Sequence, residues 1–299
     1  MGNTYSTTQA AGFIPEVWAQ TGLGKLMGEL YLAKNVARDS DFEATGKGSK
    51  VTIGKRGALV ANAKAANGTV TLQNPTDSPV EITLDEHWEV TFIVEDIVKA
   101  QSNAKLMEGY MEDAVAVLAE KIETKLSALH SGFANATGSG IIAQLKNARA
   151  TLSTNKAPKT DRFAYLEPEL INELLDADGF MDTAKYGSSM PVQEGEFGKF
   201  LGFRIFESIY ADVTGTSPLV THNLAMHKNG LVLATRPMPV LTPAEQAKIG
   251  VDQTVVERDG IIMRVTHSYD TDYLGHKITL DTLFGVGALR STFGIDIEN

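Results

Sequence analysis

The sequence predicts an α+β fold, and three observations lead to that prediction. Residues 80 to 94 alternate apolar and polar side chains, as a half-buried strand does. Residues 103 to 131 repeat apolar side chains at helical spacing. Residues 251 to 297 are rich in strand signals and contain an Asp259-Gly260 turn. Between the last two, from 140 to 240, helix and strand signals alternate, which predicts an α+β domain.

The strand signal is unusually long. At about 3.3 Å per residue, 80 to 94 would extend roughly 50 Å, where a typical strand has ~5–6 residues. The stretch before it, residues 41 to 79, is rich in Gly, Ala, Asn, Lys and Thr and offers almost nothing to a core. We therefore expect residues 42 to 95 to form one long two-stranded arm. Such a ribbon is marginal alone, so it should lie on something else, such as a neighbouring subunit. Its apolar residues occupy even positions: Val80, Ile82, Leu84, Trp88, Val90, Phe92 and Val94.

The helix follows the arm directly. Asn103 is a suitable N-cap and Gly132 a suitable stop. A coiled coil is the alternative, but the apolar stripe does not continue beyond this segment, which favours a single long helix packed against a sheet. The stripe consists of Met107, Tyr110, Met111, Ala114, Val115, Leu118, Ile122, Leu126 and Leu129.

The domain from 140 to 240 has readable elements of its own. We expect a helix over 141 to 152, a buried strand over 163 to 166 and a helix beginning near Pro168. A turn and strand should follow in GKFLGFRIFES, and a hairpin around Asn229-Gly230.

Composition indicates a folded chain without nucleic-acid or membrane affinity. The 299 residues are 43% apolar, enough for a sizeable core. The formal net charge is −10 and the basic residues are scattered, which argues against gripping duplex DNA. Cysteine is absent, which excludes disulfides, thiolate catalysis and cysteine-ligated zinc. No apolar run reaches the ~20 residues of a membrane helix, and the start does not resemble a signal peptide.

A search for catalytic motifs finds none. The histidines do not form a metal-binding pattern, and there is no nucleophile elbow, Walker loop or dinucleotide fingerprint. The sequence therefore predicts no catalytic, cofactor-binding or metal-ligating residues. The best basic patch, in GKGSKVTIGKR, lacks interleaved aromatic residues and is interpreted as a solvated or partner-facing loop tip.

The order of these parts resembles the major capsid proteins of tailed bacteriophages, which share the Hong Kong 97-type fold. FIPEVWAQ and LYLAKNVARD resemble the family's N-terminal arm, GSKVTIGKRG and VEITLDEHWEVTFIVEDIVKAQSN its E-loop strands, and YMEDAVAVLAEKIETKL its spine helix. FAYLEPELINELLDADGF and GEFGKFLGFRIFES resemble its axial domain, and HKITLDTLFGVGALR its peripheral strands. No single motif is specific, but their order and spacing are.

The resemblance implies a domain plan. It comprises an N-terminal arm and short helix (1–41), an E-loop (42–95), a peripheral segment (96–139) with the spine helix at 103–131, an axial domain (140–240) and closing peripheral strands (241–299). The E-loop would lie on an adjacent subunit. The candidate assembly-interface residues are Trp18, Lys47, Lys50, Lys55, Arg56 and Trp88.

The resemblance also implies a function. The chain would assemble in the host cytoplasm, as pentamers and hexamers, into the icosahedral head of a tailed double-stranded DNA phage. Its partners would be a separate scaffolding protein, a portal and a decoration protein, and the shell would enclose DNA without sequence-specific contact. It would be a virion protein without cofactor and not an enzyme. Two alternatives remain: an encapsulin-like compartment shell of the same fold, and a soluble enzyme with an unrecognised site.

Overall fold

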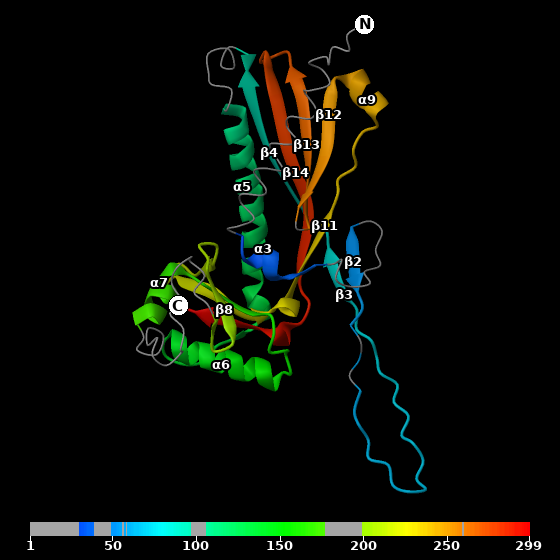
Figure 1. The fold of residues 1–299 in the computed structure, drawn as a ribbon, viewed down its shortest axis with the longest axis vertical. Coiled ribbons are helices and arrows are strands. Elements are labelled where there is room, and N and C mark those ends of the chain that lie inside the picture. Colours follow the sequence, from blue (N-terminus) through cyan, green and yellow to red (C-terminus); the bar gives the residue numbers. More distant parts are fainter. Residues whose placement is uncertain are drawn as a thin grey trace.

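The computed structural model describes residues 30–38, 49–55, 57, 59–96, 106–176, 199–258 and 260–299 and confirms the predicted α+β class. Figure 1 shows an elongated sheet with one long helix beside it, a compact mixed body at its foot, and a thin ribbon projecting away from both. The predicted N-cap Asn103 lies outside the described residues. Within the described residues, no helix combines the length and apolarity needed to cross a membrane.

The elongated sheet has six strands and is built around β14 (Gly275–Ala288). β14 pairs with strands from both ends of the chain, and all of its pairings are antiparallel. Gly260 lies in the turn between β12 (Val251–Arg258) and β13 (Ile261–Asp270) with a φ of 75°, as a tight hairpin requires, so the predicted turn is confirmed. The strand order is β1 (Ala37–Arg38), β11 (Leu231–Arg236), β14, β13 (Ile261–Asp270) and β12 (Val251–Arg258), with β4 (Glu86–Glu95) also on β14.

The long helix α5 (Leu106–Ser127) packs along this sheet, beside β4 and β14 (Figure 1). The short 3₁₀-helix η2 (Ala128–Gly132) extends it to the predicted stop. The apolar stripe is used inside the chain, which confirms a helix on a sheet instead of a coiled coil. Its buried members are Met111, Ala114, Val115, Leu118, Ile122 and Leu126, in one core with Val256, Met263, Val265, Ile278, Leu280 and Phe284.

The compact body contains a seven-stranded sheet with helices α6 (Ile141–Thr154) and α7 (Pro168–Asp176). Every residue of β6 (Arg162–Leu166) is buried, because the strand is covered on both faces. Phe163 and Tyr165 belong to the core of α5, whereas Ala164 and Leu166 belong to that of α6 and α7. The strand order is β5 (Ala134–Asn135), β15 (Gly294–Glu298), β10 (Val220–His227), β6, β8 (Phe203–Glu207) and β7 (Lys199–Phe200), with β9 (Asp212–Thr214) on β10.

The predicted hairpin around Asn229-Gly230 is wrong. β10 and β11 flank this turn but enter different sheets, joined by η3 (Lys228–Gly230). Strands also cross the boundary predicted at residue 240, since β11 joins the elongated sheet and β15 returns to the compact one. The Asn-Gly signal is local, whereas the partners that decide these pairings are tens of residues away in the sequence.

The predicted alternation over 80 to 94 is confirmed, but its continuity is not. Even positions are buried or half-buried and odd positions are exposed. The strand breaks at Leu84 and Asp85: β3 (Val80–Thr83) pairs with β2 (Lys50–Ile53), and β4 pairs with β14. Residues 80–95 therefore belong to the chain's own sheets, and among the described residues only those within 54–79 project as an arm. A period of two shows which face is buried but not which strand lies alongside.

Gly285 lets the β2–β3 ribbon lie close to β14. A Cβ at this position would overlap the carbonyl oxygen of Thr83. We expect Gly285→Ala to lower the free energy of unfolding by about 1–3 kcal/mol, as overpacking does, measured by urea denaturation. The control is Gly109→Ala in α5, where a Cβ meets nothing within 4 Å. This change should raise the free energy of unfolding by up to about 1 kcal/mol, because alanine favours a helix more than glycine does. Equal stability of Gly285→Ala and the original chain would contradict the close packing.

Candidate assembly interface

The arm, residues 54–79, consists of two segments without regular strand structure, joined by a turn at Ala66 and Asn67 and held together largely by side chains. The Ser78 amide donates to the Lys55 carbonyl (2.9 Å) and the Gly57 amide to Asp77 Oδ1 (2.9 Å). Further out, Val60 and Gln73 bond in both directions, the Val60 amide donating to Gln73 Oε1 at 2.8 Å. Pro75 and Pro79 lack an amide hydrogen, so a regular backbone ladder cannot form there. Figure 1 shows the arm extending well clear of both bodies.

The arm buries almost nothing within the subunit. Every residue from 59 to 79 is exposed. Four large apolar side chains on it are exposed to solvent: Leu59 (72% exposed), Val60 (67%), Val70 (69%) and Leu72 (91%). A lone ribbon with its apolar residues exposed is marginally stable in water. The arm is therefore suited to bind another surface, because exposed apolar side chains that lie together often mark a site of protein–protein contact.

Charge separates the arm from the rest of the chain. The arm carries Lys55, Arg56 and Lys64 against Asp77, a net charge of +2, so the remaining residues carry −12. A basic arm and an acidic body attract each other when they belong to different copies of the same chain. Copies of the body repel one another except where such complementary pairs meet.

The structure describes three of the six predicted interface residues, and they lie on different elements. Lys50 lies on β2, where its Nζ is 2.9 Å from Glu81 Oε2 across the ribbon, with more than half of both side chains exposed. Lys55 lies at the root of the arm and is exposed. Trp18, Lys47 and Arg56 lie outside the described residues. Sequence reasoning located the arm but missed its apolar side chains; the signal was the two-residue spacing of Val70 and Leu72.

Trp88, the sixth predicted residue, is engaged within the chain. Its Nε1 donates to Glu86 Oε2 (2.8 Å), and the Lys121 and Lys125 ammonium groups lie 5.2 and 5.6 Å from its ring centroid. Lys125 Nζ also contacts Glu86 Oε1 at 2.6 Å. Burial acts to raise the pKa of Glu86, but the hydrogen bonds from Lys125 and Trp88 outweigh it and lower that pKa. These contacts join β4 to α5 inside the subunit.

The segment that precedes the arm is held on α5 by a buried carboxyl group. The Ala33 amide, in α3 (Leu32–Asn35), donates to Glu123 Oε1 at 2.8 Å. Arg38 Nη2 donates to the carbonyl of the same residue, Ala33, at 2.7 Å. Burial raises the pKa of Glu123 to about 7, although the backbone amides and Arg38 act against that rise.

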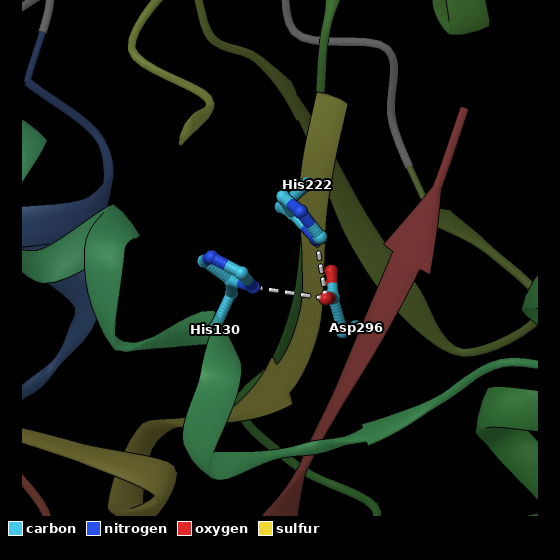
Figure 2. Close-up of side chains that lie close together, drawn as sticks. All are labelled: His130, His222 and Asp296. Carbon is cyan, nitrogen blue, oxygen red and sulfur yellow. Dashed lines mark hydrogen bonds and ion pairs between the residues drawn. The ribbon is translucent and has the colours of Figure 1, made fainter. Parts of the chain in front are cut away.

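Two histidines that form no motif in the sequence lie together in the fold. His130, in η2, and His222, on β10, meet at Asp296, on β15, and all three are buried (Figure 2). The three residues are far apart in the sequence, so no spacing pattern could reveal them. Only the pairing of β10 with β15 brings them together.

Comparison with known proteins supports the fold. No protein-family model and no curated protein sequence matches the chain significantly. Among solved structures, one from Mycobacterium phage Che8 is 18% identical, with 90% of each chain covered and a TM-score of 0.64. The capsid of the cyanophage P-SCSP1u is 12% identical, covers 88% of this chain and 86% of its own, and has a TM-score of 0.61. A virus-like particle from Pyrococcus furiosus is 11% identical, covers 95% and 98%, and has a TM-score of 0.53. The chain therefore has the fold of these phage capsid and virus-like particle subunits, which is the fold expected from its sequence.

Proposed function

We propose that this chain is the major capsid protein of a tailed double-stranded DNA bacteriophage. The observation that carries the proposal is the arm at 54–79, which is exposed, apolar in part and basic on a chain that is otherwise acidic. The arm does not bury its apolar residues in its own subunit, but a neighbouring copy that binds it can cover them. The similarity in fold to phage capsid subunits supports the same conclusion.

The assembly follows from how such an arm binds. Each subunit gives its arm to one neighbour and receives an arm from another, which is a heterologous contact and generates rings when the geometry closes. Pentamers and hexamers joined in this way form an icosahedral shell. In this proposal α5 is the spine helix, the compact sheet with α6 and α7 is the axial domain, and the elongated sheet is the peripheral domain.

The proposed partners are a separate scaffolding protein, a portal and a decoration protein. The shell is a virion component assembled in the host cytoplasm. It encloses double-stranded DNA without reading its sequence, which fits a net charge of −10, because a surface that grips DNA needs clustered basic residues. The role is structural and not catalytic.

A second candidate is the shell of a compartment that holds protein cargo, as in encapsulin-like proteins of this fold. The similarity in fold to the virus-like particle from Pyrococcus furiosus, which spans 95% of this chain, supports this second candidate. Contents separate the two: particles purified from the cells that produce the chain should contain double-stranded DNA under the first proposal and protein cargo under the second.

Electron microscopy and sedimentation of the expressed protein, with and without a scaffolding partner, test the shell itself. We expect shells, tubes or capsomers. A stable compact monomer under every condition would contradict both candidates.

A further inference from the structure

Two buried histidines converge on one carboxylate at the junction of the two bodies. His130 Nδ1 lies 3.1 Å from Asp296 Oδ2, and His222 Nδ1 lies 2.6 Å from the same oxygen. The imidazole rings are stacked, with centroids 3.6 Å apart. All three residues are at least nine-tenths buried, at 8%, 6% and 2% exposed. Figure 2 shows both rings directed toward Asp296 from two separate elements.

The outer nitrogens of the two rings are also occupied. His130 Nε2 lies 3.1 Å from Asp212 Oδ2, and His222 Nε2 lies 2.7 Å from Thr214 Oγ1. Histidines that bind metals commonly hold their second nitrogen in this way, donating to a carboxylate or another oxygen. Such an outer bond leaves the inner nitrogen with a lone pair aimed inward. Here both inner nitrogens face the same point.

The contacts around the cluster leave two hydrogen-bonding positions without a partner when both imidazoles are neutral. A neutral imidazole donates through only one of its nitrogens. Without a metal, the Thr214 hydroxyl can donate to His222 Nε2 while Nδ1 donates to Asp296; with a metal on Nδ1, Nε2 donates to Thr214 instead. His130 faces a carboxylate at both nitrogens and can satisfy only one of them. In addition, Asp296 Oδ1 is buried with no hydrogen-bond partner among the described residues. A cation at the centre would answer both deficits.

We propose that His130, His222 and Asp296 bind a divalent transition-metal ion of the Zn²⁺ type. Two imidazoles and a carboxylate are donors that zinc accepts, and the ligand atoms already lie within 4.8 Å of one another. An ion bound at about 2.0–2.2 Å requires the stacked rings to turn apart, since each nitrogen binds in the plane of its own ring. Asp212 and Thr214 act as positioning residues that hold the rings from outside.

The ion would join three segments that are distant in sequence. η2 continues α5, β10 crosses the compact sheet, and β15 lies near the end of the described chain. A metal bound only by the folded chain stabilises it by RT ln(1 + [metal]/Kd), where [metal] is the free metal concentration. The site would therefore fix the long helix to the compact body. It is independent of the arm, so its failure would leave the proposed shell function untouched.

The test is titration of the full chain with Zn²⁺ alone, after removal of bound metal, followed by calorimetry, with Co²⁺ absorption as a second readout. We expect one ion per chain. Asp296→Asn should abolish binding, and Asp212→Asn, farther out and more exposed, should weaken it about 10–100-fold. The matched control is His227→Gln, on the same strand and equally buried, where Nδ1 accepts from the Asn229 amide and affinity should not change.

Circular dichroism identifies the variants that fold, and only these are compared. Two results would overturn the proposal. One is a folded chain that takes up no Zn²⁺. The other is Zn²⁺ affinity that survives in folded Asp296→Asn and Asp212→Asn.

Discussion

Replacing residues 54–79 with the dipeptide Asn-Gly should leave a folded subunit that forms no shells. Ile53 and Val80 lie directly opposite each other in the β2–β3 ribbon, so two residues can connect them. Asn-Gly is the preferred sequence for a two-residue hairpin turn. Since every residue from 59 to 79 is exposed, the replacement removes no core, and the unfolding free energy of the isolated subunit should change little.

Assembly should respond very differently. The removed segment contains the exposed apolar side chains and the excess basic charge that a neighbouring copy would receive. Sedimentation should show only subunits or small oligomers, with an unchanged circular dichroism spectrum. The control is Thr71→Ser, which keeps the arm and should assemble normally. Normal shells from the armless variant would show that the arm is not an assembly element.

Glu123→Gln should stabilise the isolated subunit above neutral pH and remove a pH dependence. Burial raises the pKa of Glu123 from 4.5 to about 7. The folded chain therefore holds this proton more tightly than the unfolded chain. The resulting stability is fully present below pH 4.5 and is lost as the pH rises through 7. At about 1.4 kcal/mol per pH unit, the loss is on the order of 3 kcal/mol.

A glutamine is neutral at every pH and still offers an oxygen to the Ala33 amide. Urea denaturation at pH 5 and pH 8 should give similar stabilities for the two proteins at pH 5 and a more stable variant at pH 8. Asp113→Asn, exposed on the same helix, is the control and should leave the pH dependence in place. An unchanged pH dependence in Glu123→Gln would mean that this carboxyl group is already charged at pH 5.

The sequence predicts best where local pattern and burial agree. Two patterns predict which face is buried, and the structure confirms both. They are the helix stripe from Met111 to Leu126 and the alternation from Val80 to Val94. The β12–β13 turn at Gly260 was also readable, since its φ of 75° favours glycine.

Prediction fails where a partner is chosen at long range. The pattern over 80 to 94 is the same whether one strand continues or two strands separate at Leu84, and only the positions of β2 and β14 decide. The Asn229-Gly230 turn resembles a hairpin, yet its flanking strands pair with β14 and β15. Trp88 shows a long-range contact that the pattern did not reveal, since it lies against Lys121 and Lys125 of α5, and its place in an interface stays a prediction.

The two candidate sites differ in the same way: one could be predicted from the sequence and the other could not. The scarcity of core residues in 54–79 was visible from composition, so the arm could be located. The His130, His222 and Asp296 cluster could not, because its members come from η2, β10 and β15 and meet only after the compact sheet has formed.

Electron cryomicroscopy of assembled particles tests the central claim most directly. We predict closed shells in which density for residues 54–79 lies on an adjacent subunit, with the apolar side chains of the arm covered and its basic residues near acidic ones. Particles in which the arm is free in solvent or folded on its own subunit, or a preparation that contains only monomers, would contradict the account.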